Sequence, residues 1–329
     1  MPPVVTGPAA NGAPLVSVYA DDQLADYSFG PDHPFGPARL DAFLAQFHES
    51  GLAGRCRLTP TRMAQRADVE SFHAARYIER VMRLSAIGEG YLDGGDTPAF
   101  PGVYQAALRV VGTVLLAVDE LMSGQTRRAF VPIAGLHHAR AASAAGFCVF
   151  NDCAIAIQRL RQCHGLSRIA YVDIDAHHGD GVFYAFEDDP ALAIADLHED
   201  GRYLYPGTGM SSETGTGAAK GTKLNIPMPP GAGDRLFFTA WDTVLSFVDR
   251  ARPEFILLQC GADSIAGDPL THMAYSSEAH RHAAASLGAL AETHCAGRLL
   301  ALGGGGYDLR NLANAWCAVV EAMLDGSEP

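Results

Sequence analysis

Lysine is nearly absent from this chain of 329 residues. It occurs only at Lys220 and Lys223, and arginine supplies the other basic side chains. The chain has 24 basic and 37 acidic residues, which gives a formal net charge of −13. A surface this acidic repels phosphate backbones and anionic lipids, so nucleic acids and membrane surfaces are disfavoured as partners. An acidic rim would instead favour cationic partners such as lysine-rich peptides or polyamines.

The sequence also lacks paired cysteines, long apolar runs and a signal peptide. None of its seven cysteines stands in a Cys-x-x-Cys pair, and this dispersed set predicts buried free thiols in a reducing compartment. No apolar run approaches the roughly 18 residues that span a bilayer. Residues 1–14 lack the basic-then-apolar pattern of a secretory signal. We therefore expect a cytoplasmic protein, with a flexible segment at 1–14 and a single domain over 15–329.

Short apolar runs bounded by turn residues predict buried strands at 15–19, 129–133, 168–174, 192–197, 255–260 and 298–302. Stretches with helical spacing lie between them, at 103–121, 153–163, 234–249, 277–294 and 309–324. Asn151 and Asp152 are candidates for the N-cap of the helix at 153–163. Apolar strands that alternate with helices predict an α/β fold, with a central parallel sheet and helices on both faces.

Ionisable side chains follow four of these predicted strands. They are His137 and His138, the group Asp173, Asp175, His177, His178 and Asp180, then Asp263, and finally Tyr307 after the glycine run 303–306. In open parallel sheets, ligands bind beyond the carboxyl ends of the strands, and these ends meet at one edge. The sequence therefore predicts a functional site at this edge.

The group after the strand at 168–174 has the character of a metal site. Asp173, Asp175 and His177 project to one side, because residues two apart in an extended chain share a face. Carboxylate and imidazole are ligands of zinc and other divalent ions, and Asp263 would complete a set that leaves positions open for water and substrate. The alternative is that these residues are only helix caps and turn formers.

The histidine pair and the glycine run each allow two interpretations. His137 and His138 could be a surface pair without function. A carboxylate on one ring nitrogen, from Asp173 or Asp180, would instead fix the tautomer and let the other nitrogen take a proton. Tyr307, after four glycines, could donate to a developing oxyanion. The alternative for the glycine run is a phosphate-binding loop, but it lacks the Walker and dinucleotide patterns.

From about Val16 to Leu324 the chain resembles the zinc-dependent histone deacetylase family, which has an arginase/deacetylase-type fold and includes bacterial acetoin-utilisation (AcuC-like) deacetylases. The resemblance rests on strings that occur in the family's order. They are GLHHA at 135–139, GFCVFND at 146–152, VDIDAHHGDGV at 172–182, YPGTG at 205–209, GADSIAGDP at 261–269 and LGGGGY at 302–307. The string DHPFGPAR at 32–39 also resembles the family's first loop, more weakly.

The resemblance implies a role for each matching residue. The zinc ligands would be Asp175, His177 and Asp263. The catalytic residues would be His138 with Asp180 as general base and then acid, His137 with Asp173 as electrostatic support, and Tyr307 as the oxyanion donor. The substrate-binding residues would be Gly146, Phe147, Tyr205 and Leu270 along the tunnel for the lysine stem, and Asp96 at its rim. The family usually has Phe where Tyr205 stands. A structural potassium ion would be held by the carbonyls of Asp173, Asp175 and His177, with Asp196 and Leu197 as further candidates.

The implied activity is zinc-dependent removal of acetyl groups from Nε-acetyl-lysine of proteins or peptides, with release of acetate. An acyl-CoA synthetase would be a fitting substrate for a relative of the acetoin-utilisation proteins. The sequence leaves the acyl chain, the choice of Zn²⁺ or Fe²⁺ and the oligomeric state open.

Three alternatives remain beside this interpretation. A deacetylase of acetylpolyamines would use the same chemistry, but such relatives tend to carry Asn where Asp180 stands and a longer insertion in the N-terminal half. An arginase-type ureohydrolase with two manganese ions requires Asp-Ala-His-x-Asp, and here Gly179 occupies the last position. A non-catalytic binding module would lack a ligand or a catalytic side chain, and none is missing.

Overall fold

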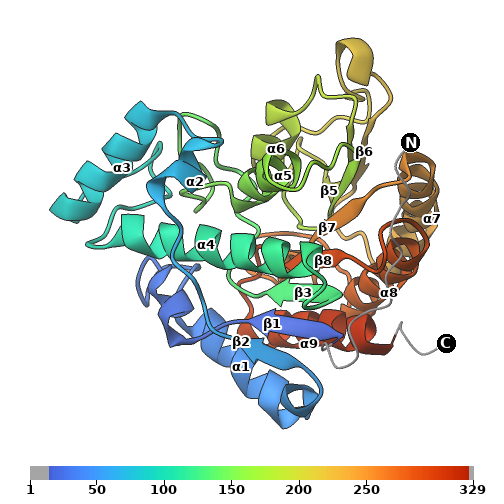
Figure 1. Ribbon diagram of the computed structural model, residues 1–329, viewed down its shortest axis with the longest axis horizontal. Helices are drawn as coiled ribbons and strands as arrows, with labels where there is room; N and C mark the ends of the chain where they lie inside the picture. Colours follow the sequence, from blue (N-terminus) through green and yellow to red (C-terminus); the bar gives the residue numbers. More distant parts are fainter. Residues whose placement is uncertain (1–14, 326–329) are drawn as a thin grey trace.

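The computed structural model describes residues 15–325, so the predicted flexible segment 1–14 lies outside the described residues, as do residues 326–329. One eight-stranded sheet runs through the described chain in the order β2-β1-β3-β8-β7-β4-β5-β6 (Figure 1). The strands are β1 (Val16–Tyr19), β2 (Arg57–Thr59), β3 (Arg128–Val131), β4 (Ile169–Asp173), β5 (Leu192–Glu199), β6 (Lys223–Met228), β7 (Phe255–Gln259) and β8 (Leu299–Leu302). Every neighbouring pair is parallel, which confirms the predicted sheet.

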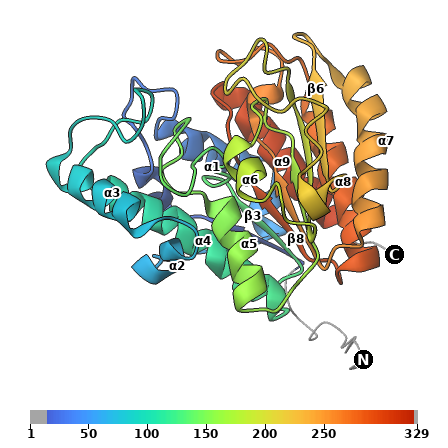
Figure 2. The ribbon, with the colours of Figure 1, turned by 90° about the horizontal axis from the view of Figure 1, so that it is seen from above.

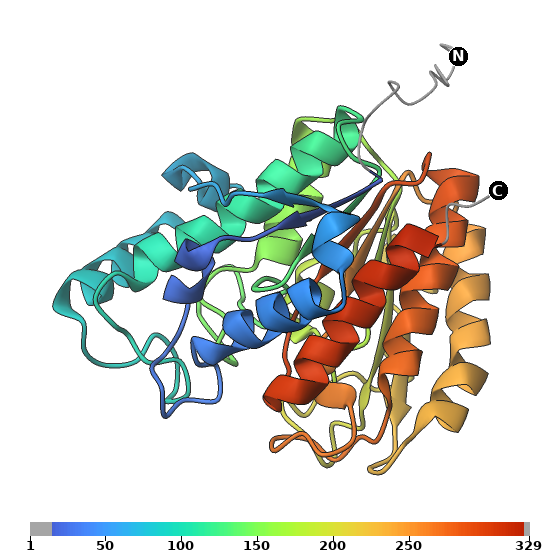
Figure 3. The same cartoon turned by 90° about the horizontal axis from the view of Figure 1, so that it is seen from below.

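Helices cover both faces of this sheet. They are α1 (Ala38–Glu49), α2 (Arg66–Glu70), α3 (Ala75–Ile87), α4 (Val103–Met122), α5 (Asp152–Gln162), α6 (Asp180–Ala185), α7 (Asp234–Ala251), α8 (Ser277–His294) and α9 (Leu309–Asp325). Helices α2 to α5 lie on one side of the strands, and α7 to α9 lie on the other (Figure 2). Helix α1 packs against α9 (Figure 3). The central strands are buried along their whole length, as their continuous apolar runs predict.

The predicted strands and helices are present, with ends that differ by no more than two residues. The sequence analysis missed β2 and β6, the two edge strands, together with the short helices and with α1 and α3. Both edge strands have partly exposed positions, and β6 contains Pro227, which an edge strand tolerates because one side of its backbone is unpaired. Strands of this kind lack the apolar run that reveals a central strand.

The start of α5 shows how local sequence positions the site. Asn151 caps the helix by accepting the backbone N–H of Ala154 at 2.9 Å, as predicted. Asp152, the other candidate cap, is instead the first residue of the helix. Its buried carboxylate accepts the N–H groups of Gly135 and Leu136 at 2.9 and 3.1 Å. Asp152 therefore fixes the loop that leads from β3 to the histidine pair.

All seven cysteines fall within the described residues, and none of them forms a disulfide. The prediction that they are buried is wrong for two of them, since Cys163 is exposed and Cys56 is only partly buried. Over residues 15–325, we find no helix that is both long and apolar enough to cross a membrane.

Candidate active site

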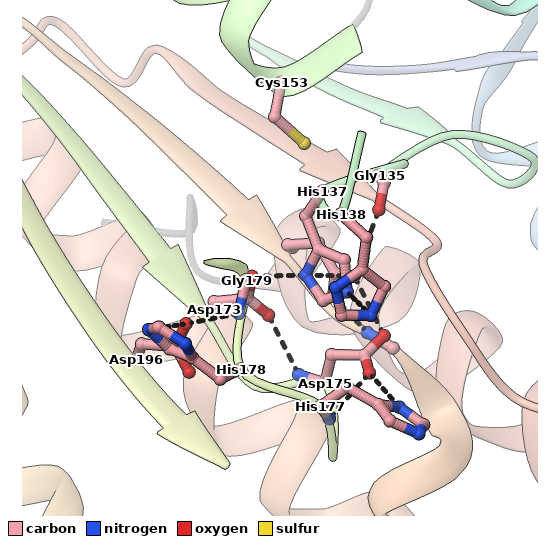
Figure 4. A network of polar contacts seen from close by, with 12 residues as sticks. Gly135, His137, His138, Cys153, Asp173, Asp175, His177, His178, Gly179 and Asp196 are labelled. Atoms are coloured by element: carbon pink, nitrogen blue, oxygen red, sulfur yellow. Dashed lines mark hydrogen bonds and ion pairs between the residues drawn. The ribbon is translucent and has the colours of Figure 1, made fainter. Parts of the chain in front are cut away.

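The side chains predicted from separate strands meet at the carboxyl edge of the sheet (Figure 4). Asp173 ends β4, and the segment that follows carries Asp175 and His177 before α6 begins at Asp180. Asp263 lies in the short turn after β7. The histidine pair arrives on the loop after β3, so residues far apart in the sequence form one cluster.

Asp175, His177 and Asp263 are the one group of three or more His, Cys, Asp or Glu residues in the described chain that could hold a metal ion, with ligand atoms within 4.8 Å of one another. His177 Nδ1 lies 3.0 Å from Asp175 Oδ1 and 3.1 Å from Asp263 Oδ2. Both carboxylates are buried. One imidazole and two carboxylates are a donor set that suits zinc or another divalent ion with open positions.

Backbone and side-chain N–H groups orient these two carboxylates. Asp175 Oδ2 accepts hydrogen bonds from Gln259 Nε2 and the Gly305 N–H, both at 2.9 Å. The Ala176 N–H donates to Asp263 Oδ1 at 2.9 Å. The remaining oxygen of each carboxylate therefore faces His177. A Cβ at position 305 would lie 2.1 Å from Asp263 Oδ2, so the glycine run is needed because its backbone approaches the carboxylates.

The electrostatics of this group also fit a cation. Burial and the charge of Asp175 raise the pKa of Asp263 to about 7. Burial alone would lower the pKa of the His177 ring, but its hydrogen bonds to Asp175 and Asp263 raise it to about 10. Two buried carboxylates that face each other are costly without a positive charge between them. The protein therefore supplies more negative charge here than its own residues neutralise.

Each histidine of the pair is held by a carboxylate. His137 Nδ1 donates to Asp173 Oδ2, and His138 Nδ1 donates to Asp180 Oδ1, both at 2.8 Å. The two Nε2 atoms lie 3.1 Å apart. All four side chains are buried, so the structure brings together the pairs that the sequence analysis predicted.

The two histidines differ in basicity. Burial and the neighbouring His137 lower the pKa of His138 to about 4. Burial also disfavours the charged form of His137, but the Asp173 carboxylate raises its pKa to about 10. A further hydrogen bond to Asp173 comes from Tyr171 Oη at 2.6 Å. His137 is therefore the more basic ring of the pair and His138 the less basic one.

Of the predicted tunnel residues, Gly146 and Tyr205 lie beside His138, and Phe147 lies beside Tyr307. Gly146 has a φ of +53°, and a Cβ there would lie 2.5 Å from His138 Cδ2. The Tyr205 ring lies 5.2 Å from the His138 ring, and the Phe147 ring lies 5.9 Å from that of Tyr307. A narrow cavity of about 20 Å³ reaches His138, His177 and Tyr307.

The two remaining predicted substrate residues lie further out. Leu270 lines a cavity of about 400 Å³ that also touches Tyr307. Asp96 is exposed and lines a different pocket of about 410 Å³, together with Tyr205. Asp93 orders the loop of Asp96 by accepting the backbone N–H groups of residues 95–97. Leu270 and Asp96 therefore border the site at its rim, outside the narrow cavity.

Comparisons with known proteins identify the family. Residues 33–323 match the model of the histone deacetylase domain. The chain belongs to the histone deacetylase family. Family membership supports a deacetylase activity in general, and the family is generally zinc-dependent.

Similar proteins come from bacteria and from a eukaryote. The chain is 36 % identical over 302 residues to the acetoin utilization protein AcuC of Bacillus subtilis (strain 168). The aligned region covers 89 % of this chain and 78 % of that protein. It is 33 % identical over 327 residues to the histone deacetylase clr6 of Schizosaccharomyces pombe, which covers 96 % and 78 %. Among solved structures, the HDA15 HD domain matches with a TM-score of 0.88 and 28 % identity, over 95 % of this chain and 88 % of that one. This match confirms the predicted arginase/deacetylase-type fold.

Three site residues of this histone deacetylase chain were missed by the sequence analysis. The buried Arg39 donates from Nε to the carbonyl of Gly306 at 2.8 Å and from Nη2 to that of Gly304 at 2.6 Å. Arg39 lies in the quoted string 32–39, so the signal was present but no role was drawn from it. Gln259 ends an apolar strand, and Arg140 follows the histidine pair in a loop, so neither stands out from its neighbours in the sequence.

The predicted potassium ligands lie beside the catalytic residues. Asp173 and Asp196 are paired in register between β4 and β5, which places the backbone at 173–177 next to that at 196–197. The Asp196 carboxylate accepts the Gly179 N–H at 2.9 Å and the His198 Nδ1–H at 2.6 Å. The potassium ion of the family stays a prediction for this chain.

Proposed function

We propose that this protein is a zinc-dependent deacetylase that hydrolyses Nε-acetyl-lysine in proteins or peptides and releases acetate. The observation that carries the proposal is a carboxylate-held histidine, His138, beside a cluster of two carboxylates and one imidazole. Family membership supports the same reaction type. Acetylated proteins, among them acyl-CoA synthetases, are the substrates that we propose.

The metal would be held by Asp175, His177 and Asp263. When bound, a divalent ion polarises an acyl carbonyl and makes water easier to deprotonate. The remaining groups belong to the chain itself. Asp180 fixes the tautomer of His138, so its Nε2 is available for proton exchange.

The proton balance of the reaction closes through His138. Its Nε2 accepts a proton from the attacking water, and the acyl carbon gains the water oxygen. The C–N bond then breaks, and His138 returns the proton to the departing lysine amine. His137, the more basic ring of the pair, lies beside it, and its protonated form would favour the negative charge that develops.

Tyr307 is the proposed donor to the oxyanion. Its ring borders the narrow cavity that reaches His138 and His177. Burial raises the pKa of its hydroxyl well above the ordinary value, so the group keeps its proton and can donate. The aromatic rings of Phe147 and Tyr205 suit the apolar stem of acetyl-lysine, whose charge the acetyl group removes.

The test is acetate release by zinc-loaded protein from an acetyl-lysine peptide pool and, separately, from N-acetylpolyamines. Asp175→Ala is the control, and the metal content of both proteins is measured by mass spectrometry. We expect peptide turnover and one zinc per chain, both lost in the variant. Turnover of N-acetylpolyamines alone would keep the chemistry and overturn the substrate class. Two tightly bound manganese ions per chain would instead indicate a ureohydrolase.

A further inference from the structure

A pocket of about 410 Å³ lies at the rim of the site, lined by residues 93–96, Arg140, residues 143–145 and Tyr205. It adjoins the reaction centre through Tyr205, whose ring contacts that of His138. The pocket holds charges of both signs, because Arg140 and Asp96 both line it. No ion pair joins Arg140 to Asp93 or Asp96 in the described chain, so these charges do not neutralise one another directly.

Arg140 connects this pocket to the proposed general base. Its Nη2 donates to Asp180 Oδ2 at 2.8 Å, and the other oxygen of the same carboxylate holds His138. The Asp180 side chain is 1 % exposed, whereas that of Arg140 is 58 % exposed. One end of the guanidinium is therefore anchored on a buried carboxylate, and the rest stands in the pocket.

The anchored guanidinium of Arg140 keeps N–H donors that are available to a ligand. Arginine carries five N–H donors in a planar fork, and of the side-chain nitrogens of Arg140 only Nη2 has a hydrogen-bonded partner among residues 15–325. Because Asp180 fixes the group, little side-chain freedom is lost when a ligand binds to the remaining donors. The pocket thus offers N–H donors from Arg140 and carboxylate acceptors from Asp96.

This combination suits a peptide backbone. A peptide presents carbonyl acceptors for Arg140 and N–H donors for Asp96 within a few ångströms of each other. A polyamine offers ammonium groups to Asp96 but no acceptor to the guanidinium, so only a peptide uses both groups. The chemistry of the rim therefore distinguishes the two substrate classes that the tunnel alone does not.

We propose that Arg140 binds a backbone carbonyl of the peptide that carries the acetyl-lysine, and so couples peptide binding at the rim to the pair of Asp180 and His138. This inference rests on the proposed function and narrows its substrates to peptide chains. A bound peptide excludes water from the ion pair of Arg140 and Asp180. The ion pair is stronger in the lower local dielectric, and it holds Asp180 and His138 more firmly.

The experiment compares two substrates that share the acetyl group and the apolar stem. One is an acetyl-lysine pentapeptide with glycine neighbours, and the other is N-acetylcadaverine, which has no backbone. Arg140→Met should lower kcat/KM for both, because Asp180 loses its partner. The loss for the peptide should be at least about tenfold larger, which is the effect of a charge-assisted hydrogen bond. Arg140→Lys should restore N-acetylcadaverine turnover more fully than peptide turnover, since an ammonium is a point charge and cannot reproduce the planar fork.

Arg55→Met is the matched control. Arg55 is 50 % exposed and pairs with Asp325 away from the site, so both substrates should be cleaved as by the wild type. Equal losses for the two substrates in Arg140→Met would reduce Arg140 to a support for Asp180 and overturn the inference. A wild type that cleaves N-acetylcadaverine as well as the peptide would overturn it too, while amide hydrolysis would stand. If neither substrate is cleaved, the proposed function itself fails.

Discussion

At its amino end the sheet buries cations, and at its carboxyl end it buries carboxylates. Lys223 begins β6 and Arg128 begins β3, and both side chains are buried. Lys223 Nζ donates to the carbonyls of Asp189 and Leu192 at 2.9 and 2.5 Å. Arg128 Nη1 donates to the Met323 carbonyl at 2.5 Å. Backbone carbonyl oxygens of the protein therefore accept hydrogen bonds from both buried cations.

At the carboxyl end, by contrast, Asp175 and Asp263 face each other with only His177 between them. Burial and the facing charge of Asp175 together raise the pKa of Asp263. Burial also lowers the pKa of Lys223, but there the ammonium is surrounded by carbonyl oxygens and not by a like charge. The difference separates two uses of a buried charge. At the amino end the buried donors have acceptors within the protein and serve the fold, whereas at the carboxyl end two like charges without a cation prepare a binding site at some cost in stability.

The largest effect that this comparison predicts comes from Asp263→Asn. The change removes one proposed metal ligand, so we expect loss of zinc and a fall in kcat/KM of more than about a thousandfold, because a catalytic metal contributes several kcal/mol. Metal analysis and acetate release measure both effects. The metal-free variant should be at least as stable to urea as the metal-free wild type, because one of two facing carboxylates has lost its charge. A clear loss of stability would mean that the Asp263 carboxylate stabilises the fold, as the buried cations at the amino end do.

Tyr307→Phe should have the next largest effect. If its hydroxyl donates to the oxyanion, the barrier rises by about 2.7–4 kcal/mol, or 10²–10³ in kcat. Stability should not change, because in the described residues no hydrogen bond reaches this hydroxyl. Steady-state kinetics and thermal unfolding of the same preparation test both statements. Full turnover by the variant would remove Tyr307 from the mechanism.

The sequence predicts the carboxyl end far better than the amino end, for physical reasons. Asp173, Asp175 and His177 stand two apart directly after an apolar strand, and this spacing alone puts them on one face. The pairing of His138 with Asp180 was also found, although the residue analysis left open which carboxylate belongs to which ring. The resemblance to the deacetylase family supplied that assignment.

Residues that act only through long-range contacts gave no such signal. Gln259 is the last residue of an apolar strand, and only the fold brings its amide to Asp175. Lys223 lies at the start of an edge strand that lacks an apolar run, so neither the strand nor the buried ammonium was predicted. Partners of this kind depend on which strands are neighbours, and periodicity does not contain that information.

Lys223→Met tests the amino end directly. The substitution keeps an apolar side chain of similar length but removes the Nζ donor from the carbonyls of Leu192 and Asp189, of which the second keeps only the Leu192 N–H at 3.4 Å. Each buried group without a partner costs about 1–3 kcal/mol, so unfolding in urea should shift by that order. Turnover by the folded protein should stay at the wild-type level. A variant that is equally stable but less active would reverse the roles that we assign to the two ends.

The pH dependence of the same pair of proteins gives the smallest predicted effect. Burial lowers the pKa of Lys223 to about 8 in the folded protein, whereas the ordinary value of about 10.4 applies to the unfolded chain. Between these two values the unfolded chain binds more protons than the folded one, so the stability of the wild type rises with pH. The Met variant lacks this group, and the difference between the two proteins isolates its titration. From pH 8 to pH 9 we expect the wild type to gain about 1 kcal/mol relative to the variant. If the difference in stability between the two proteins does not change over this interval, the carbonyl oxygens around Lys223 fully compensate the burial of its ammonium group.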